Sequence, residues 1–449
     1  VTEALNDFSF DNLAESLSNL SSAIGLDFEY ENHKLGTNDH VRYKNVTDLT
    51  VTLDHPISGA IYLKDYSGSI YKDNEWFKLP SSAYKNQIFD DFKEYDLHPQ
   101  DFPALFTEIL TPNYNENTIW IKTSQKKSRH SYAPYGTLLT SGIEYNNDLT
   151  VSSKGAKKGE GSYKFININI DDLSNRLIFS EQQNKQVPSR VVYSASDITD
   201  SKKREKILKY CKDNDLISYD DFFPVDFDIH ADPAYLLNDG DTLLAELLQN
   251  SYKDFVYDNY LEIPDTKAME EVREKYADIL ALYDGTVEST FAVLDGIHSR
   301  MEAECTYSLY PRKTPSNRDF VNYFLLENKK GYCTHFATAG VMLARMAGIP
   351  ARYATGYIVV ENDQSAGKQN NDGSLTIDVK DNRSHAWAEI YLDSIGWVPY
   401  EFTAGYSTRE ITTEPVTTAE PTTNNDATTT RTTAERTPGS VTKPSTTTP

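Results

Sequence analysis

The pattern of apolar and polar residues divides the chain into a strand-rich part and a helix-rich part. In residues 1–199, short runs of aromatic and β-branched residues are bounded by Gly, Asn, Asp and Pro, as is typical of strands. The run from Tyr163 to Ile170 partly alternates apolar and polar residues, as a half-buried strand does. Similar runs lie at residues 60–63, 118–121 and 190–193. This pattern predicts a β-rich, sandwich-like domain over residues 1–199.

Helical spacing of apolar residues begins near residue 200. Leucine, isoleucine, valine and aromatic residues recur there at intervals of three and four positions, which predicts amphipathic helices. The predicted helices cover residues 203–212, 241–250, 268–282 and 287–301. We interpret them as the helical N-terminal part of a second domain that spans residues 200–410.

A further predicted helix begins at Cys333. Phe336, Ala339, Leu343 and Met346 share one face of this helix, Gly331 comes just before it, and Gly348 with Pro350 ends it. The backbone N–H groups and the dipole at a helix N-terminus favour a thiolate over a thiol. The same N–H groups can stabilise an oxyanion that forms when the sulfur attacks a carbonyl. The position alone is also compatible with a small buried apolar cysteine.

Four predicted strands follow this helix, at residues 351–360, 375–379, 385–392 and 397–402. Alternation places His385, Trp387, Glu389 and Tyr391 on one face of the third strand. Residues 393–396 suit a turn, so the fourth strand is expected to return antiparallel and to bring Glu401 close to His385. The predicted class is α+β, with a cysteine-bearing helix packed on an antiparallel sheet that carries histidine and acid.

These residues suit a thiol–imidazole–carboxylate triad, in which the base reaches the nucleophile and an acid orients the base. We therefore expect Cys333 as nucleophile, His385 as base and Glu401 as orienting acid. Asp381 and Glu389 are alternative acids. His335 is an alternative base, although residues two positions apart on a helix do not face each other.

Composition excludes several classes of protein. The chain of 449 residues has a formal net charge of −23 and 39% hydrophobic residues, so it can form cores but lacks the basic surface of a nucleic-acid binder. Anionic membrane surfaces are excluded as partners for the same reason. The three cysteines do not form a disulfide framework, although Cys211 and Cys305 are a conceivable pair. No zinc spacing or EF-hand pattern is present, and we expect no metal and no cofactor.

The two ends of the sequence suggest a processed, tethered portion of a protein. The chain starts with Val, and it lacks a signal peptide and an apolar run long enough to span a membrane. We expect that the chain is an excised portion of a longer protein and that only the segments flanking this portion contact a membrane. Residues 411–449 are rich in Thr and Pro without apolar periodicity, which predicts a disordered stalk or a plain unstructured terminus.

Five blocks of residues resemble the transglutaminase-like superfamily, in particular its bacterial membrane-anchored branch. Their order, spacing and chemistry agree with that family, and the resemblance is clearest from Tyr252 to Tyr406. The blocks are Asp319-Phe320 with Phe324-Leu325, Gly331 to Ala337, Gly348 to Tyr353 with Gly356-Tyr357, His385 to Glu389, and Gly396 to Glu401.

The resemblance implies a papain-like core with a Cys-His-Asp triad, in which Cys333 and His385 take the first two roles. Position 401 takes the place of the acid, but it is Glu where Asp is usual, and Phe402 follows where Pro is common. Residues 61–68 with Trp76, and residues 132–136, look like the extracytoplasmic β-region of that branch. A location at the cell surface is therefore implied.

The implied activity is thiol acyl transfer on amide bonds of a protein or peptide substrate. Relatives include cross-linkers, proteases and amidases, and for a surface protein we favour hydrolysis slightly over cross-linking. Tyr332, Tyr307 and Trp387 are candidates to line the substrate cleft, or else core aromatics, which we favour for Trp387. The alternative function is a non-catalytic adhesin or scaffold with a degenerate domain of this family.

Overall fold

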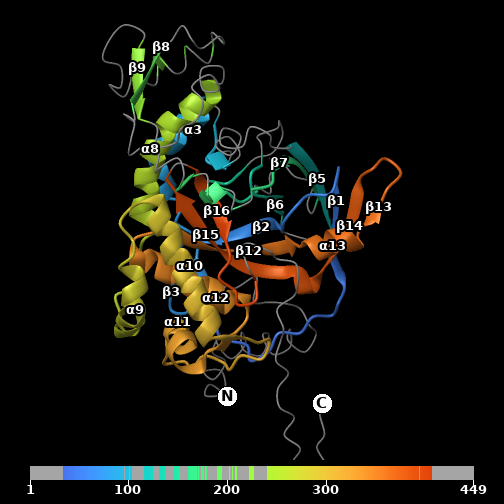
Figure 1. Cartoon of the computed structure of the whole chain (residues 1–449), viewed down its shortest axis with the longest axis vertical. Helices are drawn as coiled ribbons and strands as arrows, with labels where there is room; N and C mark the ends of the chain where they lie inside the picture. Colours follow the sequence, from blue (N-terminus) through green and yellow to red (C-terminus); the bar gives the residue numbers. More distant parts are fainter. Residues whose placement is uncertain are drawn as a thin grey trace, which may run out of the picture. The chain divides into compact units, whose positions relative to one another are not determined.

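Two five-stranded sheets and a group of helices make up the described part of the chain (Figure 1). All described residues belong to one compact unit. The computed structural model describes residues 34–95, 97–100, 102–103, 116–124, 131–137, 145–151, 160–168, 170, 173–175, 177–178, 190–194, 202, 205, 208–209, 222–226, 240–393 and 395–406.

The first sheet, which we call the site sheet, has the strand order β16-β15-β12-β2-β6 with every pair antiparallel. Its central strands come from distant parts of the sequence, because β2 of the N-terminal region pairs directly with β12. A bulge lies opposite Gly356, where an added Cβ would meet the Leu63 carbonyl oxygen at 1.9 Å. The strands are β2 (Ile61–Gly68), β6 (Ala133–Pro134), β12 (Ala351–Val359), β15 (Ser384–Leu392) and β16 (Gly396–Tyr400).

The second sheet has the order β13-β14-β1-β5-β7 and is also antiparallel. One apolar cluster joins the two sheets, since it contains Val51 and Phe165 of the second sheet and Leu63 and Val359 of the site sheet. The sheets therefore pack on each other as in a sandwich. The strands are β1 (Thr47–Leu53), β5 (Glu116–Thr123), β7 (Glu160–Ile166), β13 (Lys368–Gln369) and β14 (Leu375–Lys380).

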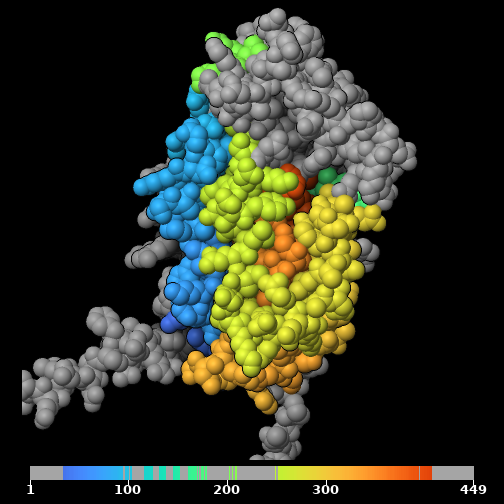
Figure 2. All heavy atoms as spheres, turned by 90° about the vertical axis from the view of Figure 1, so that its left-hand side faces the viewer, coloured from blue at the N-terminus to red at the C-terminus, as the bar shows by residue number. Residues whose placement is uncertain are grey.

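The helices between Gly240 and Ala347 pack beside the site sheet. Figure 2 shows their residues, in yellow-green to orange, over much of one face, next to residues of the N-terminal region in blue. Threonine caps begin two of them, since the Thr266 and Thr286 hydroxyls accept from backbone N–H groups three residues on. The helices are α8 (Gly240–Asn259), α9 (Lys267–Leu280), α10 (Val287–Glu304), α11 (Phe320–Asn322), the π-helical turn η3 (Tyr323–Asn328) and α12 (Cys333–Ala347).

Smaller elements complete the description. They are β3 (Ile70–Lys72) with β4 (Glu75–Phe77), η1 (Ala83–Lys85), α3 (Ile88–Tyr95), β8 (Arg190–Ser194) with β9 (Phe222–Asp226), β10 (Thr306–Tyr307) with β11 (Lys330–Gly331), α13 (Glu361–Ala366) and η4 (Asp381–Arg383). Among the described residues, no helix combines the length and apolar character that crossing a membrane requires.

The predicted α+β class is confirmed, with a β-rich N-terminal region and a cysteine-bearing helix beside an antiparallel sheet. The helices predicted from residues 241, 268, 287 and 333 are present, as are the four strands that follow them. Helix α13 was not predicted, because its residues read as a polar loop. The predicted helix at residues 203–212 is described at only a few positions, and the predicted stalk lies outside the described residues.

The division of the chain into residues 1–199, 200–410 and 411–449 stays a prediction. Both sheets nevertheless mix strands from the two sides of residue 200, since β2 pairs with β12 and β1 pairs with β14. Strand pairing buries the backbone polar groups of both partners, so these pairs tie the N-terminal region to the helix-rich part of the chain.

Candidate active site

Cys333 is the first residue of α12, as the sequence predicted, and it follows the extended residue Tyr332. Gly331 is required just before it, because an added Cβ there would lie 2.4 Å from the His335 ring. The helix ends at Gly348, whose φ of 97° favours glycine. The sulfur therefore lies beside the free N–H groups of a helix N-terminus. The Cys333 side chain is buried, with 4% exposure.

His385 and Glu401 form a buried pair. The distance between His385 Nε2 and Glu401 Oε2 is 2.6 Å, and the two residues are 2% and 0% exposed. His385 lies at the start of β15, and Glu401 directly follows β16, so the antiparallel hairpin brings them together. The Cys333 side chain lies next to the His385 ring, close enough to raise the pKa of that ring. Because Nε2 is engaged by Glu401, Nδ1 is the ring nitrogen left for the sulfur.

Two further groups hold the Glu401 carboxylate. The backbone N–H of Thr403 donates to Oε1 at 2.8 Å, and the Tyr62 hydroxyl donates to Oε2 at 3.3 Å. Sequence reasoning missed both contacts. Thr403 lies two residues beyond the acid, and its contact with Glu401 could have been predicted as part of a local turn. Tyr62 lies 339 positions away, and no local pattern signals its approach.

The charges of the site support one another. Burial by itself disfavours the charged ring of His385, but the neighbouring Glu401 and Cys333 outweigh it and raise the pKa of His385 to about 10. Burial likewise disfavours the Glu401 carboxylate, but His385 and Thr403 hold the pKa of Glu401 below its ordinary value. The imidazolium and the carboxylate are thus the stable forms at neutral pH.

Aromatic side chains surround this group. The Tyr406 ring lies 5.0 Å from the His385 ring, and burial together with the nearby Cys333 raises the pKa of Tyr307 well above its ordinary value. Tyr332 is 5% exposed and next to Cys333. Trp387 is completely buried, and its indole N–H donates to the Tyr135 hydroxyl at 2.9 Å, as in a core aromatic. A role of these residues in substrate binding stays a prediction.

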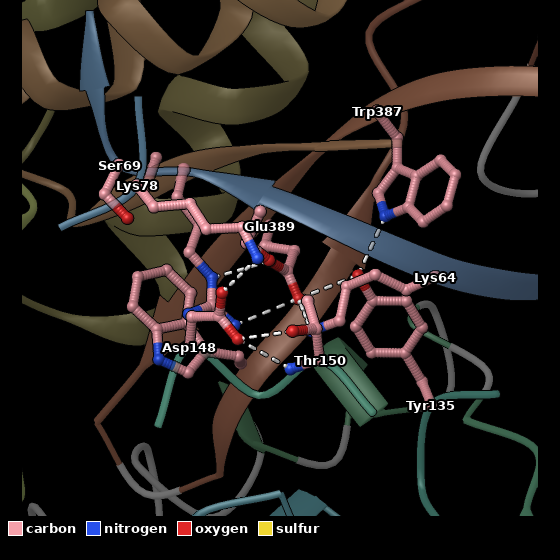
Figure 3. A network of polar contacts seen from close by, with 12 residues as sticks. Lys64, Ser69, Lys78, Tyr135, Asp148, Thr150, Trp387 and Glu389 are labelled. Carbon is pink, nitrogen blue, oxygen red and sulfur yellow. Dashed lines mark hydrogen bonds and ion pairs between the residues drawn. The ribbon is translucent and has the colours of Figure 1, made fainter. Parts of the chain in front are cut away.

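The alternative acid Glu389 belongs to a separate buried network (Figure 3). Its carboxylate accepts from Arg352 Nε at 2.6 Å and from Lys64 Nζ at 2.7 Å. Ser67 and Tyr135 donate to it as well. Burial opposes the charge on Glu389, but Arg352 and Lys64 lower its pKa to about 2. Glu389 therefore serves as a structural counter-ion within the site sheet.

The other two alternatives are also engaged elsewhere. The Asp381 carboxylate accepts from the backbone N–H of Lys44. His335 lies 4.5 Å from the Phe320 ring, and its Nδ1 accepts from the backbone N–H of Tyr332 at 3.4 Å. Burial lowers the pKa of His335 to about 3, so it stays neutral. Glu401 is thus the acid that contacts His385, and His385 is the histidine that contacts Cys333.

The remaining chemistry-bearing groups do not add to the site. Cys305 is a free, buried thiol, and burial raises its pKa to about 11. The other half of the conceivable disulfide, Cys211, lies outside the described residues. Within the described part of the chain, no three His, Cys, Asp or Glu side chains gather so that they could hold a metal ion.

The family model described as the transglutaminase-like superfamily matches residues 281–402, which include Cys333, His385 and Glu401. Over this segment the chain is similar to the transglutaminase-like superfamily.

Two curated relatives are similar to parts of the chain. The uncharacterized protein YebA of Bacillus subtilis (strain 168) is 34% identical over 176 residues, which is 39% of this chain and 22% of YebA. The protein-glutamine gamma-glutamyltransferase of Pseudomonas aeruginosa is 34% identical over 97 residues, which is 22% of this chain and 13% of that protein. The matched segments thus span less than a quarter of either relative.

Among solved structures, the periplasmic domain of TgpA from Pseudomonas aeruginosa bound to ethylmercury is similar to this chain at 14% identity and a TM-score of 0.44. That likeness covers 82% of this chain and 91% of the other.

Proposed function

We propose that the protein is a thiol acyl-transfer enzyme that acts on amide bonds of proteins or peptides. The observation that carries the proposal is the buried His385–Glu401 pair, with 2.6 Å between Nε2 and Oε2, beside a cysteine at a helix N-terminus. A nucleophile, a base in contact with it and an acid that orients the base are the parts that such chemistry needs. The glutamyltransferase relative supports the same reaction class.

In the proposed first step, the Cys333 thiolate attacks the carbonyl carbon of the amide, and a tetrahedral oxyanion forms. The backbone N–H groups at the start of α12 are placed to stabilise this oxyanion. The His385 imidazolium then gives its proton to the leaving nitrogen, the C–N bond breaks, and a thioester to Cys333 remains. Glu401 holds the ring in position throughout and stabilises its positive charge.

In the second step, an amine or a water molecule attacks the thioester. His385, now neutral, takes a proton from the attacking group, and the C–S bond breaks to restore the thiolate. An amine acceptor produces a new amide, and water produces a carboxylic acid. We favour water slightly, because the resemblance to the membrane-anchored branch suggests a surface protein that acts on peptides. A position outside the membrane at the cell surface is part of this proposal.

One observation favours the alternative of a non-catalytic scaffold. The Cys333 side chain is only 4% exposed, so a substrate reaches the sulfur only after neighbouring side chains move. Cys305, at 5% exposure, offers a matched comparison within the same protein. The two buried thiols differ mainly in their neighbours, since Cys305 has no contact with a histidine among the described interactions.

Alkylation at pH 6 tests the proposal. Iodoacetamide is expected to modify Cys333 about tenfold faster than Cys305, because Cys333 lies beside the His385 ring at a helix N-terminus, whereas burial raises the pKa of the Cys305 thiol to about 11. Peptide mapping by mass spectrometry measures both rates. Equal slow labelling of the two cysteines would support the scaffold. Amine incorporation into casein and cleavage of casein, each compared between wild type and Cys333→Ala, then separate cross-linking from hydrolysis.

A further inference from the structure

Strand β2 brings a tyrosine hydroxyl from the N-terminal region to the acid of the candidate site. The Tyr62 hydroxyl donates to Glu401 Oε2 at 3.3 Å, on the oxygen that also contacts His385. The Tyr62 side chain is partly buried. Burial and the neighbouring carboxylate raise the pKa of Tyr62 well above its ordinary value, so its hydroxyl keeps its proton and remains a donor.

The Glu401 side chain needs more support than a shorter acid would. Glutamate has one more rotatable bond than aspartate, so fixing its carboxylate costs more conformational entropy. Thr403 holds Oε1, and without Tyr62 the only described contact on Oε2 is the His385 ring itself. A second donor on Oε2 fixes the carboxylate independently of the ring that it has to orient.

We propose that Tyr62 is a positioning residue for the site, with its hydroxyl holding the Glu401 carboxylate where that carboxylate accepts the Nε2 proton of His385. This inference rests on the proposed function. It assigns part of the catalytic apparatus to the β-rich N-terminal region. The segment 200–410 alone lacks this donor, because β2 ends at Gly68.

The Tyr62 ring is held separately from its hydroxyl. It packs edge-on against Trp387, with 5.0 Å between ring centroids, and Trp387 is anchored through its hydrogen bond to Tyr135. A phenylalanine at position 62 therefore keeps the ring contact and removes only the bond to Glu401. The ionisable groups near Glu401 are His385, Tyr62 and Tyr307. Cys333 lies next to His385, and Tyr406 lies next to Tyr62.

The test compares Tyr62→Phe with Tyr66→Phe in the full chain. Tyr66 lies on the same strand, and its hydroxyl donates to the Trp76 carbonyl oxygen at 2.9 Å, so its loss controls for removing a tyrosine hydroxyl from β2. The readout is the rate at which iodoacetamide alkylates Cys333 between pH 4 and 9, followed by mass spectrometry. This readout needs no knowledge of the natural substrate.

We expect the acid limb of the Tyr62→Phe profile to lie about one pH unit above that of wild type. The loss of a hydrogen bond that stabilises a carboxylate raises the pKa of that carboxylate by about one unit. Alkylation at pH 5 then falls about three- to tenfold, with a smaller change at pH 8. Tyr66→Phe is expected to follow the wild-type profile. Coincident profiles for all three proteins would overturn the inference.

A double-mutant cycle tests whether Tyr62 acts through Glu401. In the Glu401→Gln background no carboxylate is present, so adding Tyr62→Phe is expected to leave the profile unchanged. An equal loss in both backgrounds would mean that the hydroxyl acts elsewhere, and the inference would be wrong. Wild-type Cys333 that reacts no faster than Cys305 would instead overturn the proposed function and this inference together.

Discussion

The His385 ring and the Glu401 carboxylate are 2.6 Å apart, although 16 positions separate them in the sequence. Both are buried, so each would be unfavourable as an isolated charge. Their pairing, together with the contact between His385 and Cys333, explains how three buried polar groups are stable together. This relationship also makes the site sensitive to changes in any one of the three.

Substitutions of Glu401 are expected to affect activity in a graded way. Glu401→Gln keeps the size of the side chain but removes its charge, and we expect kcat/KM to fall by about 10² to 10⁴. Glu401→Asp keeps the charge but withdraws it by one methylene from His385, Tyr62 and Thr403, so a smaller loss of about tenfold is expected. Steady-state assays with the substrate found for wild type measure both.

A matched control for Glu401 is Asp148→Asn. Asp148 is another buried carboxylate, paired with Lys78 at 2.7 Å outside the site. Its substitution is expected to lower stability while the rate of Cys333 alkylation stays near wild type. A comparable loss of alkylation in Asp148→Asn would show that the effects at Glu401 reflect general destabilisation.

The protonation of His385 predicts a pH dependence of stability. The pKa of His385 is raised from its ordinary value of 6.5 to about 10 in the folded chain. The resulting stabilisation is fully present below pH 6.5 and is lost as the pH rises through about 10. Urea unfolding of wild type and His385→Gln is therefore expected to show a difference in the free energy of unfolding that shrinks between pH 6.5 and 10. A difference that grows over this range would contradict the prediction.

Removal of the sulfur is expected to lower the pKa of His385. Cys333 is one of the two neighbours that raise it, and Glu401 is the other. In Cys333→Ala, NMR titration of the ring should place the pKa between 6.5 and the wild-type value. The Cys305→Ala variant is the control, and an identical shift there would show that the contact with Cys333 is not the cause.

The Glu389 network predicts a contrast between two substitutions. Glu389→Gln leaves Arg352 and Lys64 buried without a counter-ion, and a loss of about 3–5 kcal/mol in the free energy of unfolding is expected. Lys64→Met leaves the Arg352–Glu389 pair intact and should cost less than half as much. Burial and Arg352 lower the pKa of Lys64 to about 8 despite Glu389, so the charged form of Lys64 is less stable than the charged form of Arg352. Urea unfolding at pH 7 measures both, and a larger loss in Lys64→Met would contradict this assignment.

Phe402, which follows the acid Glu401, packs closely against α12 at Gly340 and so constrains the position of this helix. A Cβ added at Gly340 would lie 2.1 Å from Phe402 Cδ2. Gly340→Ala is expected to cost about 1–3 kcal/mol and to slow alkylation of Cys333, because it pushes α12 away from the residues beside Glu401. Adding Phe402→Leu should restore part of both.

Gly296→Ala is the control for this substitution. Gly296 also lies in a helix, and its added Cβ would meet the movable side chain of Ile279 at 3.0 Å. Thermal unfolding is expected to change little, because the gain in helix propensity offsets the contact. An equal loss in Gly296→Ala and Gly340→Ala would contradict the role of Phe402.

Local patterns were enough to predict the pieces of the site. Helical spacing after Cys333, with Gly331 and Gly348 at the two ends, placed the sulfur at a helix N-terminus. Alternation from His385 and the turn before Trp397 predicted the hairpin that brings Glu401 to His385. These features could be predicted because periodicity, caps and turns depend on residues that are neighbours in the sequence.

The sequence by itself therefore determined the α+β class, the helix that carries Cys333 and the hairpin that joins His385 to Glu401. Only the tertiary structure decided that β2 inserts beside β12, that Tyr62 contacts Glu401, and that Glu389 pairs with Arg352 and Lys64. The physical reason is the range of the interactions. Pairing of strands that lie far apart in the sequence is selected by the burial of the whole core, and no short stretch of residues encodes its register.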